Sequence, residues 1–480
     1  MAQQKRSTPG VPQVIRLPLM GAYSNRGSDT TTDQRFVNIF PETRKVEQLE
    51  NTKIFLNKRP GLSLYKNFGI GTGRGCIYFN GKFYVVIGDS VIEDGVTPTT
   101  KITLTNSSGP VGLLLGNSST IGDYLFVCDG TSGWIINTVG VVTQITDTDF
   151  PTPHIPTPIF IDGYVVIAKG SDVYTCDVDN PLGWTVSNFL SAEMFPDPIV
   201  ALSRQNNQVV VLGHSSIEFF YDAANAAGSP LSRNDSTTIQ MGCAAPYALI
   251  GNEKYIFYVS QSDSGGRAAW LIDGFQPKKV SDEYIERILD AEVDMSDCRG
   301  FGLRTKGHLF YVLNLKTSGR TLVYDSDEKL WHEWASNTSG VNGVFQCDHM
   351  ADNTTGAAYL LHNSNGSLYK LDPTAYVDDT TPIIVELVTN RYDMDTYHRK
   401  FMHSCKIVCD RYAVTNDIKL QWTNDDYQTW SNVKTISLSD DFPAFQRMGV
   451  FRRRAFKLVH DTNNPLRVES LEVEYTEGDT

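Results

Sequence analysis

One unit recurs along this chain: a turn, an apolar strand, a second turn and another strand that often carries an aromatic residue. It starts at residues 79, 121, 161, 205, 251, 306 and 356, as in FNGKFYVVIGDSVI and IGDYLFVCDGTSGWII. Short runs of Val, Ile, Phe, Tyr and Thr cut by Gly, Asn and Asp predict strands. Strand units with a period of about 40 to 50 residues are typical of β-propeller blades, because stacked blades cover the apolar face that one hairpin leaves exposed. The repeat therefore predicts an all-β protein with a propeller of six or seven blades.

The repeat also divides the chain into three expected segments. Its period stops at the polar stretch DPTAYVDDTTP, so residues 61–375 are assigned to the propeller. Residues 376–480 hold six or more strand patterns and predict a separate C-terminal β-sandwich. Residues 1–60, with repeated Pro and Gly and few strand patterns, are expected to form an extended N-terminal arm. The best helical candidate is the acidic stretch Asp282 to Asp297.

Composition excludes several classes. The formal net charge of −13 disfavours sequence-specific DNA binding, because an acidic chain repels phosphates. Eight cysteines, spread singly from Cys76 to Cys409, indicate buried reduced thiols rather than a disulfide framework. No run approaches 18 apolar residues, so no membrane span is expected.

The stretch GHSSIEFFY, from Gly213 to Tyr221, has two interpretations. Gly-His-Ser-Ser resembles the start of a nucleophile elbow, which would make Ser215 or Ser216 an attacking group. An elbow also requires Gly two residues after the serine, and position 217 is Ile. The stretch occupies the place of a hairpin turn in its repeat unit, so we expect a turn, with Gly213 supplying an unusual φ angle.

Three further motifs suggest chemistry only weakly. The run GIGTGRGC lacks the Gly-Lys-Ser/Thr ending of a phosphate loop and is expected to lead into the first blade. His332-Glu333-Trp334 begins like a zinc-protease motif, but position 336 is Ser, so a packed blade strand is favoured. His403, Cys405 and Cys409 would alternate onto one strand face, and we favour packing over metal binding there.

The stretch TNDDYQTW, from Thr423 to Trp430, resembles an Asp-box hairpin in which Tyr427 replaces glycine. In such a hairpin the aspartate ties a turn and the tryptophan packs beneath it, so the motif predicts structure rather than catalysis. With 55 acidic residues in the chain, no pair can be singled out as acid and base.

Arg452, Arg453 and Arg454 form the densest positive run. On a strand, Arg453 would point to one face and Arg452 with Arg454 to the other. Two roles stay open: a solvated edge strand protected by charge, or a protein–protein interface with an acidic neighbour.

The order of these pieces resembles the packaged-DNA stabilisation proteins of short-tailed double-stranded DNA bacteriophages, also called tail hub, nozzle or head-completion proteins. FVNIFPE at Phe36 and RPGLSLY at Arg59 are similar to that family's N-terminal arm, and GRGCIYFNGKFYVV to its entry into the first blade. SSIEFF with the following Ala/Gly loop and Gln-x-Gly is similar to its central signature. RMGVFRRRAFKLVHDTNNPLRVESLEVEY is similar to its C-terminal end. The resemblance covers nearly the whole chain.

The resemblance implies a structural virion protein of the phage tail, assembled in the host bacterial cytoplasm. Such a tail hub is expected to form a ring, usually a homohexamer, that attaches below the portal–adaptor (head-completion) protein. It would close and extend the DNA channel, stabilise the packaged genome and serve genome ejection. Its further partners would be a tail needle or plug, tail spikes or fibres, and double-stranded DNA that passes without sequence-specific binding. No catalytic residue, cofactor or metal is expected.

Two other classes compete with this interpretation. A propeller-type glycosidase or polysaccharide depolymerase of a phage tail would need a cleft with convergent carboxylates, arginines or an activated tyrosine. A cellular propeller scaffold is the third class.

Overall fold

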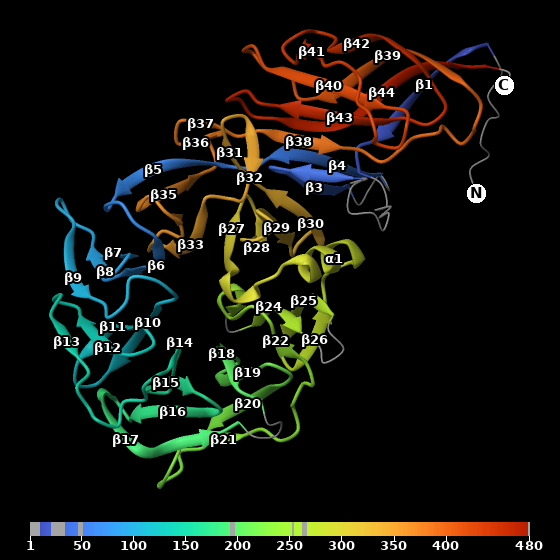
Figure 1. Cartoon of the computed structure of the whole chain (residues 1–480). Helices are drawn as coiled ribbons and strands as arrows, with labels where there is room; N and C mark the ends of the chain where they lie inside the picture. Colours follow the sequence, from blue (N-terminus) through green and yellow to red (C-terminus); the bar gives the residue numbers. More distant parts are fainter. Residues whose placement is uncertain are drawn as a thin grey trace. The chain divides into compact units, whose positions relative to one another are not determined.

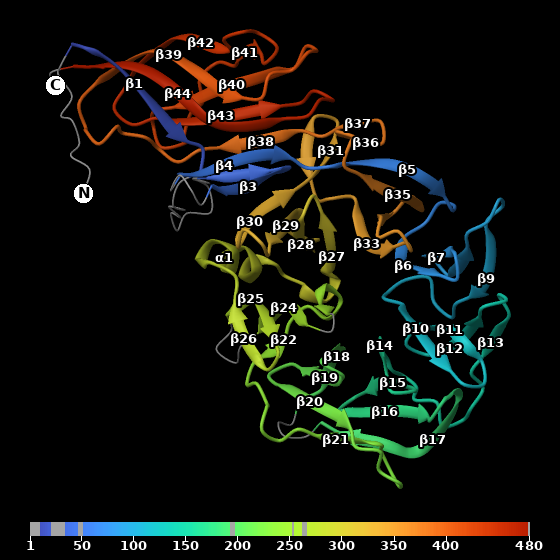
Figure 2. The same ribbon diagram turned by 180° about the vertical axis from the view of Figure 1, so that it is seen from behind.

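The computed structural model describes residues 10–20, 34–46, 51–192, 197–251, 254–261 and 266–478. The regular elements of the described residues are strands apart from helix α1 and two short 3-10 helices, which confirms the predicted all-β class (Figures 1 and 2). The chain makes two compact units. Unit 1 comprises Met1–Ser63, Leu322–Val344 and Asp372–Thr480, and unit 2 comprises Leu64–Thr321 and Phe345–Leu371.

Unit 2 consists of successive antiparallel sheets, of which the first four have four strands each. The first two sheets contain β6 (Gly73–Phe79), β7 (Lys82–Ile87), β8 (Ser90–Glu93) and β9 (Thr99–Thr103), then β10 (Gly112–Ser118), β11 (Gly122–Cys128), β12 (Gly133–Asn137) and β13 (Val142–Gln144). The next two contain β14 (Ile155–Ile161), β15 (Tyr164–Lys169), β16 (Asp172–Asp177) and β17 (Asn180–Ser191), then β18 (Ile199–Gln205), β19 (Gln208–Gly213), β20 (Ile217–Asp222) and β21 (Leu231–Arg233). A five-stranded sheet follows, made of β22 (Gly242–Cys243), β23 (Ile250–Gly251), β24 (Tyr255–Gln261), β25 (Arg267–Asp273) and β26 (Gln276–Lys279). Strands β27 (Arg299–Thr305), β28 (His308–Leu315), β33 (Cys347–Asp352), β34 (Ala358–His362) and β35 (Ser367–Asp372) complete the unit.

The repeat in the sequence corresponds to hairpins of these sheets. Six of its seven segments form the antiparallel pairs β7–β8, β11–β12, β15–β16, β19–β20, β24–β25 and β34–β35, which confirms them as strand units. The seventh forms β28 and β29 (Arg320–Asp325). The tight turn of the first unit lies at Asn80 and Gly81, whose φ angles of 47° and 83° suit Asn-Gly.

Apolar side chains pack between successive sheets of unit 2. Val86 and Val91 of the first sheet share a core with Leu125 and Val127 of the second. Equivalent cores join the second sheet to the third, the third to the fourth and the fourth to the fifth. One more core joins β6–β8 to β33–β35. Sheets that cover one another's faces in this way give a propeller-like arrangement, and the number of blades stays a prediction.

The predicted helix is present. Helix α1 (Glu283–Ala291) is capped by Asp282, whose side chain accepts hydrogen bonds from the backbone N–H groups of Tyr284 and Ile285. The 3-10 helices are η1 (Pro246–Ala248) and η2 (Met295–Asp297). Within the described ranges, no helix is long and apolar enough to cross a membrane.

Unit 1 contains strands of two sheets. One sheet contains β1 (Pro12–Pro18), β3 (Ile39–Val46), β4 (Asn51–Lys58), β39 (Lys400–Cys409), β42 (Ala444–Phe451) and β44 (Arg467–Glu477). Strands β30 (Leu330–Trp334), β2 (Arg35–Val37), β38 (Val385–Val388), β43 (Ala455–His460), β40 (Asp417–Thr423) and β41 (Lys434–Ser437) follow one another in the second. Four short strands, β31 (Ser336–Thr338), β32 (Val341–Gly343), β36 (Val377–Asp378) and β37 (Thr381–Pro382), complete unit 1. Strand β5 (Gly61–Asn67) begins in unit 1 and ends in unit 2.

The two sheets of unit 1 share one core, to which Leu17, Leu56, Phe445 and Phe456 belong. The expectation of few strands in the first 60 residues is wrong for the described part, because β1 to β4 lie there. Strand β1 pairs with β44 along its whole length, so its hydrogen-bonding partner lies near the far end of the chain. The three predicted segments and the C-terminal sandwich stay predictions.

A buried arginine connects distant segments of unit 1. The Arg59 guanidinium donates to both carboxylate oxygens of Asp378, at 2.9 and 2.5 Å, and to the Ala335 carbonyl at 3.0 Å. Its Nε donates to the side-chain oxygen of Asn38 at 2.8 Å, and the same oxygen accepts from the Ala335 N–H. Asn38 also donates to the Ile384 carbonyl at 2.8 Å, so one polar cluster joins five stretches of chain. The motifs FVNIFPE and RPGLSLY meet here.

We predict that Asp378→Asn lowers the free energy of unfolding by about 3–5 kcal/mol, because it leaves the buried Arg59 charge without its counter-ion. Chemical denaturation measures the effect. Asp379→Asn is the matched control, since Asp379 is exposed and has a φ of 57° that Asn tolerates. Equal effects of the two changes would contradict the proposed role of the ion pair.

Candidate functional site

Arg452 and Arg453 lie in a bend between β42 and β43, and Arg454 forms an isolated β-bridge with Tyr392 directly before β43. The predicted alternation of side chains is therefore wrong, because bend residues do not follow the two-residue period of a strand. The three arginines have three different environments. Arg452 and Arg453 are partly exposed, whereas Arg454 is 1% exposed.

Arg454 stabilises the interior of unit 1. Its guanidinium donates to the carbonyls of Met448 and Val450, at 2.7 and 3.3 Å, and its Nε to Asn424 at 2.9 Å. It also lies 4.4 Å from the centre of the Phe451 ring. Burial lowers the pKa of Arg454 to about 10. A residue with these contacts is not available to another subunit.

The other two arginines bind surface groups. Arg453 donates to Asp426 at 3.1 Å, and Asp426 also pairs with Arg391 at 2.9 Å. Arg452 donates to the Tyr397 carbonyl at 2.6 Å and lies 5.4 Å from the centre of the Tyr397 ring. An interface role for this run stays a prediction, and the structure restricts it to Arg452 and Arg453.

The Asp-box-like stretch forms the expected side-chain-tied turn. The Asp425 carboxylate accepts from the Thr423 hydroxyl at 2.7 Å and from the N–H and hydroxyl of Thr429. Hydrogen bonds from Thr429 and Thr423 lower the pKa of Asp425 to about 2. Tyr427 fills the glycine position with a φ of 69°, and its hydroxyl donates to the Thr389 carbonyl at 3.0 Å. The side chains of this motif are engaged in holding their own turn.

The Gly213–Ser216 stretch is a hairpin turn, as predicted: Gly213 N–H donates to the Ser216 carbonyl at 2.8 Å. The reason for glycine differs from the expected one. A Cβ on Gly213 would lie 2.4 Å from the Asp197 carboxylate, so a close approach requires glycine there. Asp197 accepts from the hydroxyls of Ser215 and Ser216, at 3.1 Å each. That neither serine is a nucleophile stays a prediction.

The glycine run leads into β6, as predicted. It contains a buried arginine, Arg74, that the sequence analysis did not identify. Arg74 donates to the carbonyls of Gly109, Gly88 and Ser108 and to the backbone and side chain of Asn106. Its guanidinium therefore holds a loop rather than a phosphate. The only signal in the sequence was an arginine embedded in glycines.

Arg74 lines a cavity of about 490 Å³ in unit 2. Arg299, Lys316, Asp297 and Asp348 also line it. Lys316 pairs with Asp348 inside the cavity, and Arg299 lies 3.5 Å from Asp297. These ion pairs engage Arg299 and Lys316, whereas Arg74 binds backbone carbonyls and the Asn106 side chain.

The remaining candidate motifs have side chains that are used in packing and in hydrogen bonds within the chain. His332-Glu333-Trp334 lies on β30 with Trp334 buried, which confirms a packed strand, and Glu333 accepts two hydrogen bonds from Arg35.

His403 and Cys405 do not share a face, because the register of β39 shifts between Met402 and Ser404. His403 is exposed, and burial raises the pKa of the Cys405 thiol to about 12. All eight cysteines are free, and among the residues that the structure describes no group of three or more His, Cys, Asp or Glu is arranged to hold a metal.

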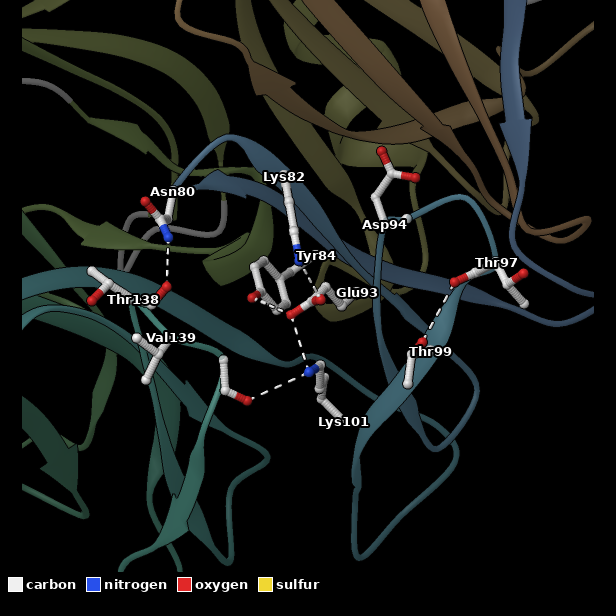
Figure 3. Close-up of polar contacts among 12 residues, drawn as sticks. Asn80, Lys82, Tyr84, Glu93, Asp94, Thr97, Thr99, Lys101, Thr138 and Val139 are labelled. Atoms are coloured by element: carbon white, nitrogen blue, oxygen red, sulfur yellow. Dashed lines mark hydrogen bonds and ion pairs between the residues drawn. The ribbon is translucent and has the colours of Figure 1, made fainter.

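Charged side chains join the first two sheets of unit 2 at the Glu93 cluster (Figure 3). Glu93 accepts from Lys82 at 2.6 Å and from the Tyr84 hydroxyl at 2.7 Å, and lies 3.3 Å from Lys101. Lys101 reaches the Gly140 carbonyl of the second sheet's turn at 3.4 Å. Burial raises the pKa of Glu93, but hydrogen bonds from Lys82, Tyr84 and Lys101 and the charge of Lys101 together leave the pKa lowered.

We predict that Arg454→Ala lowers the free energy of unfolding by at least about 3 kcal/mol, because it removes several buried hydrogen bonds and leaves carbonyls unpaired. Arg453→Ala is the matched control and should cost under about 1 kcal/mol, since its ion pair is partly exposed. Denaturant unfolding of both variants gives the comparison. Equal costs would refute the assignment of different roles to neighbouring arginines.

We predict a pH-dependent effect of Glu93→Gln. A lowered folded pKa favours the carboxylate in the folded state, so its contribution is complete above the ordinary value of 4.5 and disappears as pH falls through the folded pKa. The variant should be less stable by about 1–3 kcal/mol at neutral pH, and the difference should shrink in acid. Unfolding midpoints across pH measure this. A pH-independent difference would argue against the carboxylate as the cause.

The stacked sheets of unit 2 place the chain in the propeller-like class. A family model described as Bacteriophage P22 Gp10, beta-propeller matches residues 15–376. The chain belongs to this phage stabilisation family, which confirms the resemblance found in the sequence.

Solved structures give weaker similarity. The extracellular domain of a proposed one-component system from B. thetaiotaomicron is 11% identical at a TM-score of 0.44, over 74% of this chain and 44% of that domain. A streptogramin B lyase structure is 9% identical at a TM-score of 0.39, over 66% of this chain and 97% of the lyase. Virginiamycin B lyase from Staphylococcus aureus is 10% identical at a TM-score of 0.39, over 66% of this chain and 99% of the lyase. TM-scores this low carry no argument about function. No curated protein matches the chain.

Proposed function

We propose that this protein is a structural subunit of a phage tail, a tail hub or nozzle that forms a ring below the portal–adaptor complex. It closes and extends the DNA channel, stabilises the packaged genome and serves its ejection. The observation that carries the proposal is the family match over residues 15–376, a family of bacteriophage proteins. The proposal places the protein in the virion tail after assembly in the bacterial cytoplasm, with a homohexameric ring.

The physical properties of the chain support this role. Sheets tied by buried cores and by side chains such as Arg74 and Glu93 form a rigid block, which suits a part that bears the pressure of packed DNA. A net charge of −13 per copy suits a channel through which DNA slides, because carboxylates repel phosphates within about 10 Å at 0.1 M salt. The other partners in the proposal are a needle or plug and spikes or fibres.

The proposal includes the absence of enzymatic activity. The turn motifs that suggested hydrolytic chemistry use their side chains to hold turns, as Asp425 and Asp197 do. A glycosidase or depolymerase remains the rival, and it predicts hydrolysis of capsule or sialoside substrates by the purified protein.

The decisive experiment removes the protein from the phage and adds it back. Heads assembled without it should fill and then lose DNA to added nuclease, because the channel is left open, and purified protein should restore protection. Electron microscopy of complete virions should place a ring of this protein at the portal vertex. Nuclease-resistant DNA in heads without the protein, or glycan hydrolysis by the purified chain, would refute the proposal.

A further inference from the structure

A buried lysine of unit 1 has very few partners for its charge. Lys58 is the last residue of β4 and is 1% exposed. Its side chain donates to the Thr462 carbonyl at 2.7 Å, and that is its one hydrogen bond to the residues that the structure describes. A charged ammonium group has three donors, and burying a charge without partners is costly. The protonated form of Lys58 is therefore disfavoured in the folded unit.

The polar groups around the Lys58 side chain are already used by one another. The Thr462 hydroxyl donates to the Asn416 side-chain oxygen at 2.7 Å, and the Asn416 amide donates to the Pro465 carbonyl at 3.0 Å. His460 Nε2 lies 2.7 Å from the same Asn416 oxygen. Burial and the Lys58 charge lower the pKa of His460 to about 3, so this ring stays neutral. The remaining protons of a charged Lys58 find no acceptor among these groups.

The charged neighbours do not compensate Lys58 either. Arg59 follows it in the chain and is a second buried cation, and both carboxylate oxygens of Asp378 bind Arg59. Asp461 forms its ion pair with Lys419. Both carboxylates are thus engaged by other cations, and within the described ranges neither forms an ion pair with Lys58.

Lys58 binds a loop through both its backbone and its side chain. Residues 461–466 connect β43 to β44. The Lys58 backbone N–H donates to the Leu466 carbonyl at 3.0 Å, and its side chain binds Thr462 near the other end of the loop. Directly after the loop, β4 pairs with β44 through two residue pairs. The contact between Lys58 and the loop therefore contributes to the attachment of the β3–β4 hairpin to this sheet.

We propose that Lys58 is a pH-sensitive lock in unit 1. As an uncharged amine it holds the loop of residues 461–466 against the end of β4, and when it takes up a proton from solvent it releases that loop. The lock is a property of the single chain, so it does not depend on the proposed function or on a ring.

The lock acts between alkaline and neutral pH. Burial, with the Arg59 charge as a smaller cause, lowers the pKa of Lys58 from 10.5 to about 7, whereas Asp378 and Asp461 raise it. In the released form the amine is hydrated and regains its ordinary pKa. Between these two values the released form binds a proton that the locked form lacks, so release becomes easier as pH falls, by up to about tenfold per pH unit. Below the lower value both forms carry the proton, and the released fraction stays constant.

Hydrogen exchange of the full-length protein tests the lock. The reporter is the backbone amide of residue 58, whose hydrogen bond to the Leu466 carbonyl is lost on release. In the wild-type protein its protection, corrected for intrinsic exchange chemistry, should fall by at least about tenfold between about pH 9 and about pH 7. Amides of β39 should not follow this fall, because the release is local.

Two variants show whether Lys58 is the titrating group. Lys58→Met cannot take up a proton, so its loop should stay closed and the fall in protection should disappear. Lys457→Met is the matched control, since Lys457 lies on β43 and is partly exposed and paired with Glu386 at 3.1 Å. It should keep the wild-type profile.

Each other outcome overturns the lock. Constant protection of residue 58 in the wild-type protein across this pH range would do so, whether or not Lys58→Met folds. An unchanged fall in Lys58→Met would show that the titrating group lies elsewhere. A parallel fall at β39 would show that unit 1 opens as a whole rather than at this loop.

Discussion

The ion pair between Arg59 and Asp378 is the interaction on which unit 1 depends. Both groups are buried, and a buried ion pair is tolerated only where further hydrogen bonds satisfy the remaining donors and acceptors. Asn38 and the Ala335 carbonyl supply these bonds. Because the four partners come from distant parts of the sequence, the cluster can form only when the N-terminal strands have joined the C-terminal ones. It therefore specifies the arrangement of unit 1 more than it adds to its stability.

Unit 2 uses polar side chains differently. Its cores lie between sheets, and charged groups at the sheet ends bind the loops of the next sheet. Asp129 accepts from the Thr105 N–H at 2.9 Å, and Arg74 binds the loop that includes Ser108. Each such hydrogen bond fixes the position of one sheet relative to its neighbour. Apolar packing alone would let the two sheets slide past each other. In a protein built from repeated sheets, these hydrogen bonds therefore define the geometry between neighbouring sheets.

The sequence predicted the repeated hairpins because their signals are local. A turn such as Asn80-Gly81 and the strands beside it lie within a few residues, so the period is visible without knowledge of the fold. Strand β1 was missed because its partner β44 lies more than 450 residues away, whereas β3 and β4 form a local hairpin that the sequence analysis did not identify. The faces of His403 and Cys405 were predicted wrongly because a register shift at Met402 changes the alternation, and no residue pattern announced it.

The arginine run shows why a charge count predicts so little about a site. Three adjacent residues of one type were treated as a unit, yet Arg454 lies in the core, Arg453 binds Asp426 and Arg452 binds the Tyr397 carbonyl. Burial also gives the three arginines different roles. A desolvated guanidinium must use all its donors within its own subunit. A partly exposed guanidinium can hold a surface aromatic side chain.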